Sequence, residues 1–444
     1  MNQTVEIPWG GDALQIRMPS RWRILGELKP AVVQAARSPQ EACKEALAAP
    51  IGAQRLASRD LAQRKILIIA DDHSRPTPVR DFIGPVLDEL AAAGVREGDI
   101  RILLANGVHR ASRPEEIECK LGREVVGRFA PICHDAYDPQ GLEYVGTTSR
   151  GTRVVLNKLV LQADLILCLG ALEPHLLMGF GGGLKMIIPG CAAAETVGRN
   201  HLQGVDPDDF DYVGVSGAQS PMRLDLEEGA ALAGKEIFIV NAAMDAHAHP
   251  VQFFCGDPVK AHRGGESFVE GLARLDVPEQ SDAVLTNSFP MDLDLRQSIK
   301  CVGNSLYACK PGGVMMGCLR CDQGIGEMPT SRNLPYPVMK ALLKIIGKHR
   351  ILGLVEKAKK DQPVEEIFVG HFALQMLRRN HLAIFSDSSA LPPDIGKRLG
   401  VARSFTAAQN MVAWAASKVP KNATVWVVPH GGATYARPEH LMNQ

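Results

Sequence analysis

Short apolar runs alternate with longer amphipathic segments along most of this sequence. The apolar runs, bounded by glycine, proline or charged residues, predict buried strands at 65–70, 100–105, 129–132, 163–169, 237–241, 283–286, 314–318, 382–385 and 424–428. Apolar residues at helical spacing predict helices at 38–47, 79–93, 224–233, 258–275, 294–306, 336–346, 364–379 and 406–416. They also predict one helix that begins at about 113 and another that ends near 201. Two alternating runs at 4–7 and 14–18 predict an opening hairpin. The whole pattern predicts an α/β fold with mostly parallel sheets flanked by helices.

The chain is long enough for two hydrophobic cores. Its 444 residues exceed the size of one ordinary domain. The polar segment 276–281 is typical of a linker, so we predict an N-terminal α/β domain at 1–275 and a Rossmann-like domain at 276–444. We expect the extreme C-terminus to pack back on the N-terminal domain.

Charge and composition exclude several classes of partner. Basic and acidic residues number 49 each, so no net field favours nucleic acid or an anionic membrane. No apolar run approaches the roughly 20 residues of a membrane span, and the first residues lack the pattern of a signal peptide. Ten cysteines without a framework spacing predict buried thiols in the cytoplasm, and the CxxC at 318–321 has no second pair to complete a zinc site.

Polar clusters follow three of the predicted strands. They carry Asp72 and Arg75 in DDHSRPTP, His109 and Arg110 in NGVHR, and Glu173 and His175 in LEPH. The carboxyl ends of parallel strands meet at one edge of a sheet, so we expect these clusters to share a rim. Arg75 offers a permanently charged fork of donors for a carboxylate or oxyanion, although a helix-entry turn with a local ion pair is the alternative. Two histidines suit the inversion of a stereocentre, which needs a proton-handling group for each face of the substrate.

A glycine cluster follows the third of these strands. Gly181, Gly182 and Gly183 precede Lys185, and a backbone without Cβ atoms beside a lysine is suited to an anion. Met186 stands where a Walker A loop has Ser or Thr, and the spacing is not a dinucleotide fingerprint either. The spacing alone therefore leaves open an anion site or a tight connection.

A second polar pair lies in the C-terminal half. Gln297 and Lys300 are three residues apart at the start of a predicted helix, so both project from one face. An amide and an ammonium suit a substrate carboxylate, and solvated surface is the alternative.

Taken together, these motifs resemble those of a known enzyme family. DHSRP, NGVHR, EPHLLMGFGGGLKMIIPG, the histidine that closes the next helix, and LRQSIK occur in the order seen in lactate racemase-like proteins, over roughly residues 70 to 300, and CDQGIG at 321–326 also fits. The family comprises racemases and epimerases of 2-hydroxy acids that use a nickel-pincer nucleotide. The resemblance implies that the N-terminal domain carries catalysis and cofactor binding and that the active site lies in the cleft between the domains.

The resemblance also implies roles for individual residues. The cofactor would be pyridinium-3,5-bisthiocarboxylic acid mononucleotide, with Lys185 forming a covalent link and His201 ligating nickel. Gly181, Gly182 and Gly183 would cradle the phosphate, with Asp72 and Arg75 also at the cofactor. His109 and His175 would alternate as base and acid on the 2-hydroxyl while the C2 hydride passes to the pincer carbon and back. Arg75, Gln297 and Lys300 would orient the substrate, and Asp72 would orient His109 or Arg75.

Two departures from the family pattern bear on the substrate. Arg296 stands where lactate-specific members tend to have tyrosine, and GHF at 370–372, with Phe372, stands where the family often has Asp, Gln and Trp. An added arginine near the substrate favours a dicarboxylic or sugar acid over lactate, unless Arg296 points to solvent.

Two other functions remain open from the residues alone. A non-catalytic binder or carrier of the same nucleotide would need neither His109 nor His175, and a hydrolase with an ordinary metal would need only zinc or manganese. The expected partners are a small 2-hydroxy acid and the proteins that make the cofactor, with neither nucleic acid nor membrane; an oligomer is compatible with the sequence.

Overall fold

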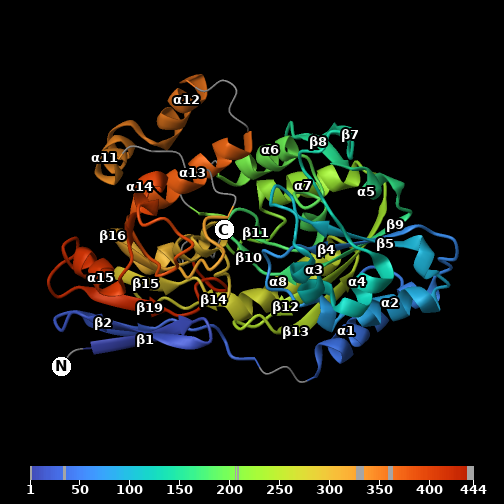
Figure 1. The fold of residues 1–444 in the computed structure, drawn as a ribbon, viewed down its shortest axis with the longest axis horizontal. Coiled ribbons are helices and arrows are strands. Elements are labelled where there is room, and N and C mark those ends of the chain that lie inside the picture. The colour runs from blue at the N-terminus through green and yellow to red at the C-terminus, as the bar shows by residue number, and fades with distance from the viewer. Residues whose placement is uncertain are drawn as a thin grey trace. The chain divides into compact units, whose positions relative to one another are not determined.

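The structure, a computed structural model, describes residues 3–33, 37–205, 207, 210–326, 335–358 and 364–437. The chain forms two compact units (Figure 1). We call Val32–Gly204 with Val215–Leu272 the N-terminal unit, and Met1–Ala31 with Val205–Gly214 and Ala273–Gln444 the C-terminal unit. Among the described residues, the helices are all too short or too polar to cross a membrane.

The N-terminal unit is built on a six-stranded sheet. Its strands, in spatial order, are β13 (Pro250–Gly256), β12 (Glu236–Met244), β9 (Leu165–Leu172), β4 (Ile66–Asp71), β5 (Ile100–Ala105) and β6 (Ile132–Cys133). All neighbours are parallel except β13, which is antiparallel to β12. Every residue of β4 and β9 is buried, as expected for central strands covered on both faces.

Helices cover this sheet on both sides. They are α1 (Pro39–Ala48), α2 (Ile83–Ala92), α3 (Pro114–Leu121), α4 (Arg123–Phe129), α5 (Lys158–Gln162), α6 (Ala194–Val205), α7 (Pro221–Ala231) and α8 (Lys260–Ala273), and a hairpin of β7 (Leu142–Thr147) and β8 (Arg153–Asn157) is added. Figure 1 shows α1 and α2 on one side of the sheet and α6 and α7 on the other. A capping box formed by Ser38 and Glu41 starts α1.

The C-terminal unit contains a second six-stranded sheet, which is parallel throughout. Its order is β18 (Arg403–Phe405), β17 (His381–Phe385), β16 (Cys309–Cys318), β15 (Ser281–Asn287), β19 (Thr424–Val428) and β3 (Arg23–Glu27). The helices described in this unit are α9 (Leu295–Ser298), α10 (Lys300–Asn304), α11 (Tyr336–Ile346), α12 (Lys348–Ala358), α13 (Val364–Arg379), α14 (Ile395–Leu399) and α15 (Ala408–Ala416). The predicted α/β class is confirmed.

The division of the chain differs from the predicted one at the N-terminus. The predicted hairpin forms as β1 (Gln3–Trp9) and β2 (Asp12–Met18), but its buried side chains join the core of the C-terminal unit. β3 then pairs with β19 as an edge strand of that unit's sheet. The assignment of residues 1–31 to the N-terminal domain is therefore wrong, because the pairing that decides it joins positions about 400 residues apart.

The end of the chain also has an observed partner. β20 (Tyr435–Ala436) pairs with β14 (Arg274–Leu275) inside the C-terminal unit. Residues 438–444, which we expected to pack on the N-terminal domain, lie outside the described residues.

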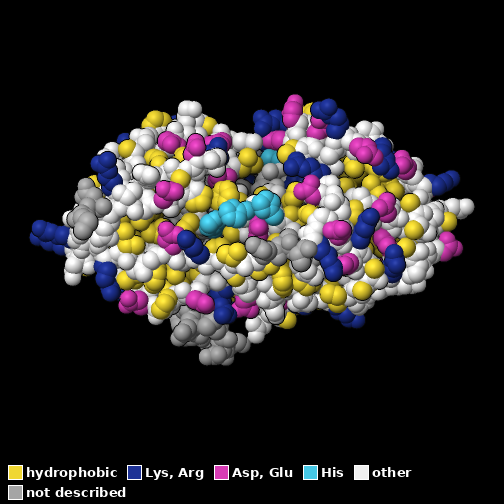
Figure 2. Space-filling view, turned by 90° about the horizontal axis from the view of Figure 1, so that it is seen from below, with side chains coloured by type: hydrophobic (Ala, Val, Ile, Leu, Met, Phe, Trp, Pro, Cys, Tyr) yellow, Lys and Arg dark blue, Asp and Glu magenta, His cyan; other side chains and the backbone are white. Residues whose placement is uncertain are grey.

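Local differences from the predicted elements have local causes. Phe129 ends α4 instead of starting a strand, and the strand there, β6, has only two residues. The helix predicted at 294–306 is divided into α9 and α10. β13 was not predicted, and its buried residues, Pro250, Phe253, Cys255 and Gly256, do not alternate regularly. The charge balance is visible on the surface, where Figure 2 shows basic and acidic side chains interspersed.

Candidate active site

Three adjacent strands bring the predicted rim together. β9, β4 and β5 are neighbours in the sheet, so the loops at their carboxyl ends lie side by side. His109 Nδ1, after β5, lies 2.8 Å from Asp72 Oδ2, after β4. Arg75 Nε lies 3.3 Å from Glu173 Oε1, after β9. The prediction that these clusters share a rim is confirmed.

Asp72 and His109 form an oriented pair. Asp72 is 3% exposed, and Ser74 donates its hydroxyl to Oδ1 at 2.6 Å. Burial alone would raise the pKa of Asp72, but the charge and hydrogen bond of His109, with Arg75 and Ser74, hold this pKa well below its usual range. An ionised carboxylate only accepts, so the proton lies on His109 Nδ1 and the lone pair on Nε2. His109 is therefore arranged as a base.

His175 has the opposite arrangement. The Leu177 N–H donates to His175 Nδ1 at 3.2 Å, so this nitrogen carries the lone pair. In the neutral ring, Nε2 then carries the proton. His175 is therefore arranged as an acid when His109 is arranged as a base.

A buried lysine that the sequence analysis missed supports the loop of Asp72 and Arg75. Lys120 Nζ, on α3, donates to Asp71 Oδ1 at 2.8 Å and to the carbonyls of Arg75 at 2.7 Å and Thr77 at 2.9 Å. A salt bridge with satisfied hydrogen bonds at all these points fixes the backbone that carries Arg75. The spacing of 45 residues between Lys120 and Arg75 left no local signal for this contact.

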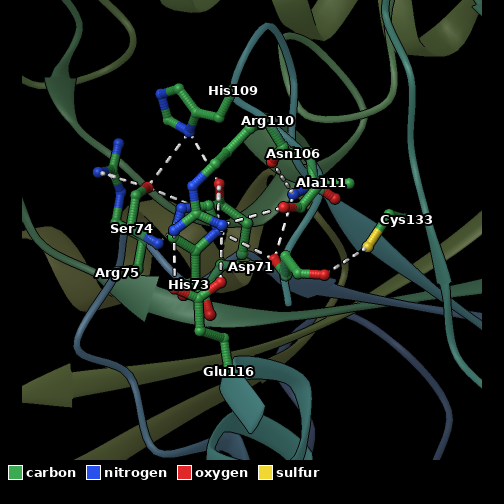
Figure 3. Close-up of polar contacts among 12 residues, drawn as sticks. Asp71, His73, Ser74, Arg75, Asn106, His109, Arg110, Ala111, Glu116 and Cys133 are labelled. Atoms are coloured by element: carbon green, nitrogen blue, oxygen red, sulfur yellow. Dashed lines mark hydrogen bonds and ion pairs between the residues drawn. The ribbon is translucent and has the colours of Figure 1, made fainter. Parts of the chain in front are cut away.

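Arg110, the other basic residue of the NGVHR cluster, has a different role. Its guanidinium contacts both Glu116 oxygens, at 2.8 and 2.7 Å (Figure 3). This bidentate pair ties the loop after β5 to the start of α3.

The glycine cluster is a turn that excludes side chains. Gly182 and Gly183 have positive φ angles, +80° and +57°. A Cβ on Gly182 would lie 2.6 Å from the Ala171 carbonyl oxygen. Three buried side chains hold this turn: His262 Nε2 donates to Gly181 O at 2.8 Å, Arg223 Nη1 donates to Gly182 O at 2.9 Å, and Asn241 Oδ1 accepts from Gly183 N at 2.9 Å.

We expect Gly182→Ala to destabilise the protein by about 2–4 kcal/mol, because the substitution adds a left-handed non-glycine residue and a clash with backbone. Chemical unfolding measures the loss. Gly98→Ala is the control, since a Cβ there meets nothing within 4 Å. Equal stability of the two variants would contradict the geometry of the turn.

Acid stability provides a second prediction, through His262. Burial, then Arg223, lowers the pKa of His262 from 6.5 to about 4. The unfolded chain therefore binds this proton first, and stability is lost as pH falls from about 6.5 to 4, by up to about 3 kcal/mol. Unfolding at several pH values should show a shallower loss for His262→Gln, whose amide still reaches Gly181 O without titrating. If the free energy of unfolding falls with pH equally in the wild type and His262→Gln, the folded protein does not hold His262 in its neutral form.

Lys185 lies in this turn with an unusual environment. Its side chain is 6% exposed, and Nζ has no hydrogen-bond partner among the described residues. Burial, then the charges of Arg75 and Arg223, lower the pKa of Lys185 from 10.5 to about 7, against the opposing charge of Glu173. An orphaned amine with this pKa fits a covalent link to a cofactor and has no evident structural purpose.

His201 is suited to bind a metal through one nitrogen. It lies in α6, which continues to Val205 beyond the predicted end, and His201 Nδ1 donates to Val197 O at 2.8 Å. The lone pair therefore lies on Nε2. Within the described ranges, no three His, Cys, Asp or Glu residues come together as a metal site.

Comparison with known proteins identifies the family. A family model described as lactate racemase N-terminal domain matches residues 9–210. A lactate racemase of Thermoanaerobacterium thermosaccharolyticum is 31% identical over 412 residues, which are 90% of this chain and 94% of that enzyme. The chain belongs to the lactate racemase family. A lactate racemase of Lactiplantibacillus plantarum is 29% identical over 303 residues, covering 67% of this chain and 70% of that enzyme.

Solved structures agree with the family assignment. The lactate racemase apoprotein of T. thermosaccharolyticum matches with a TM-score of 0.82 and 27% identity, covering 98% of this chain and 100% of the other. A protein of Thermotoga maritima shares the fold, with a TM-score of 0.66 and 19% identity over 92% of this chain and 100% of its own. The predicted family is confirmed, and the chain is an enzyme of the isomerase class.

The substrate residues predicted from the family pattern lie in the C-terminal unit. Lys300 Nζ donates to Gln297 Oε1 at 2.6 Å, so the two side chains do meet, and Gln297 is 1% exposed. Arg296, which precedes Gln297 in α9, is half-buried. Because each unit is described by itself, the approach of these residues to the rim stays a prediction.

The second departure from the family pattern has a structural explanation. Phe372, on α13, packs against Phe210 with ring centroids 5.1 Å apart. Both residues belong to the C-terminal unit, and the contact is apolar. Phe372 therefore has a packing role inside that unit.

Proposed function

We propose that this lactate racemase family member interconverts the stereoisomers of a 2-hydroxy acid at C2, with His109 and His175 as the acid–base pair. The observation that carries the proposal is the complementary proton arrangement of the two histidines. Nε2 of His109 holds a lone pair because Asp72 fixes its tautomer, and Nε2 of His175 holds a proton because Leu177 donates to Nδ1. One acid and one base at the rim meet the requirement of an inversion.

The residues present fit a nickel-pincer nucleotide. The orphaned Nζ of Lys185 would form the covalent link, the turn of Gly181, Gly182 and Gly183 would accept the phosphate, and His201 Nε2 would ligate nickel. When bound, the cofactor would supply a reversible acceptor for the hydrogen on C2, so that a planar 2-oxo acid can be reduced from either face.

The chain's own residues would bind the substrate and move its hydroxyl proton. His109 would take the proton from the 2-hydroxyl, and the buried charge of Asp72 would stabilise the imidazolium that forms. Arg75, which faces Glu173, would hold the substrate carboxylate. For the other enantiomer, the proton would start on His109 and His175 would serve as the base. Gln297 and Lys300 would complete the carboxylate site from the C-terminal unit.

The relatives act on lactate, and we extend the proposed substrates of this chain to larger 2-hydroxy acids. Arg296 precedes Gln297 where lactate-specific members tend to have tyrosine. A second carboxylate or a hydroxylated chain would engage this guanidinium.

We further propose that the enzyme acts in the cytoplasm, where its ten unbridged cysteines would stay reduced. We propose that separate biosynthetic proteins supply its cofactor, and that nucleic acids and membranes are not partners.

Three measurements on one preparation test the proposal. The protein is co-expressed with the cofactor-making proteins, and intact mass and nickel content are determined. Enantiopure 2-hydroxy acids are then screened by optical rotation, including substrate deuterated at C2. We expect a mass increment, near-stoichiometric nickel, and retention of deuterium in both enantiomers. Washout of deuterium into water would show deprotonation at C2 and would reject the acid–base roles proposed for His109 and His175.

The substrate extension has its own control. Arg296→Tyr restores the residue found in lactate-specific relatives. We expect it to shift kcat/KM away from malate, tartrate and sugar acids and towards lactate by about tenfold, the effect of one charged hydrogen-bonding group. Identical profiles for wild type and variant would remove Arg296 from the substrate site and leave the racemase proposal in place.

A further inference from the structure

The charges of four groups from three segments of the chain act on Lys185. Arg75 faces it from the loop after β4, Asp71 from the end of β4, Glu173 from the segment after β9, and Arg223 from α7. None of these groups forms a hydrogen bond to Lys185 Nζ. A buried ammonium without a hydrogen-bond acceptor is strongly disfavoured, so the burial of Lys185 among these groups needs a reason.

The carboxylates around Lys185 are already paired with other cations. Glu173 contacts Arg75 at 3.3 Å, and Asp71 contacts Lys120 at 2.8 Å. The next carboxylate, on α7, is Glu227, which contacts Arg223 at 2.8 Å. Arg263 of α8 shares that carboxylate, again at 2.8 Å. A protonated Lys185 would therefore add a positive charge beside carboxylates that already have cationic partners.

Arg223 is more deeply buried than Arg75, the other arginine that acts on Lys185. It is 0% exposed, and its Nε is held by Glu227. Its Nη1 donates to the Gly182 carbonyl, and its Nη2 lies 3.2 Å from the place that a Cβ on Gly183 would occupy. Burial lowers the pKa of Arg223 from 12.5 to about 10, so its guanidinium still carries its charge near neutral pH. It therefore places a positive charge behind the turn that carries Lys185.

We propose that Arg223 is a positioning residue for Lys185, which holds the glycine turn and keeps the lysine amine unprotonated and nucleophilic in the cofactor-free chain. The pKa of about 7 that burial, Arg75 and Arg223 impose on Lys185 agrees with this geometry. The inference rests on the proposed function for its purpose, because an amine ready for covalent capture serves the cofactor link. Its ligand class is the carbon of a thiocarboxylic acid on an anionic nucleotide: the Nζ–C bond would form, the C–OH bond would break, and the hydroxyl would leave as water with a proton of the amine.

Competitive labelling of the cofactor-free protein tests the inference. The chain is expressed without the cofactor-making proteins and treated with trace acetic anhydride at pH values from about 5 to 11. Mass spectrometry then gives the acetylation rate of Lys185 at each pH. The midpoint of this profile depends on protonation, while limited access only scales all rates together. We expect a midpoint near 7 in the wild type.

Two variants separate the charge of Arg223 from the fold. Arg223→Gln keeps a donor for Gly182 O but removes the charge, and we expect the midpoint to rise by about one pH unit, with a rate at pH 7 about fivefold to tenfold lower. Arg223→Lys restores the charge and should return the midpoint toward the wild-type value. Arg263→Gln is the matched control, since it perturbs the same Glu227 pair from α8 without facing Lys185, and its midpoint should not move.

Two outcomes would overturn the inference. A wild-type midpoint near 10 would show an ordinary protonated lysine, whatever the variants do, and an unchanged midpoint in a folded Arg223→Gln protein would remove Arg223 from the explanation. The cofactor link is judged separately: a midpoint near 7 without a mass increment in the co-expressed protein would reject that link and leave the amine state standing.

Discussion

Replacing His109 by glutamine lowers kcat for racemisation by about a hundredfold to ten-thousandfold, the range expected when a positioned general base is lost. The expectation follows from the 2.8 Å contact with the buried Asp72, which keeps the lone pair on Nε2. Cofactor loading, measured as mass and nickel, should not change. Initial rates with both enantiomers of the substrate check the prediction.

A neighbouring histidine provides the matched control. His73 lies in the same loop; its Nδ1 contacts Ser112 Oγ at 3.0 Å and lies 3.8 Å from Asp72 Oδ2, beyond hydrogen-bond distance. His73→Gln should change kcat less than threefold. Asp72→Asn should resemble His109→Gln, because an amide can donate to Nδ1 and so favours the wrong tautomer. An active His109→Gln enzyme would show that another group takes the hydroxyl proton.

Replacing Lys185 by methionine abolishes both the mass increment and the racemase activity, and it makes the cofactor-free protein more stable. The pKa of Lys185 falls from 10.5 to about 7 on folding. At pH 7 and below, the folded chain must therefore bury a disfavoured charge, at a cost on the order of 2–5 kcal/mol. This cost disappears as the pH rises through the folded and then the unfolded pKa, so the advantage of the variant should vanish near pH 10. Chemical unfolding of the cofactor-free proteins at pH 6, 7 and 10 measures it.

A second buried lysine, Lys120, provides the comparison, because its replacement should lower the stability of the protein. Lys120→Met removes three hydrogen bonds and leaves Asp71 buried without its cation, so a loss of about 3 kcal/mol is expected at pH 7. If Lys185→Met is destabilising to a similar extent, Lys185 has a structural partner in solution and is not held ready for a cofactor.

Much of the N-terminal unit could be predicted from local patterns. The runs that became β4, β5 and β9 are short, apolar and bounded by polar loops, so their periodicity survives in any tertiary context. The rim followed from one rule, that parallel strands end at a common edge, and His109 and Asp72 do meet there. The family motifs then supplied roles that spacing alone left open for Lys185 and His201.

The residues that support the site could not be predicted in this way. Lys120, Arg223, Asn241 and His262 occur in ordinary helix or strand sequences, and each contacts the site across at least 40 residues of chain. No periodicity records such a contact, because it depends on which helices pack together and on which carboxylates are already paired. The same reason made the placement of residues 1–31 wrong.

The sequence by itself determined the order of strands and helices, the α/β class and the identity of the rim residues, because backbone hydrogen bonding and apolar burial act over a few neighbouring positions. Only the tertiary structure decided the protonation states. The lone pair on His109 Nε2 depends on Asp72, and the amine of Lys185 depends on the pairing of the carboxylates around it. Electrostatic interactions in a buried site reach across segments that are distant in the chain, and they are set when those segments pack.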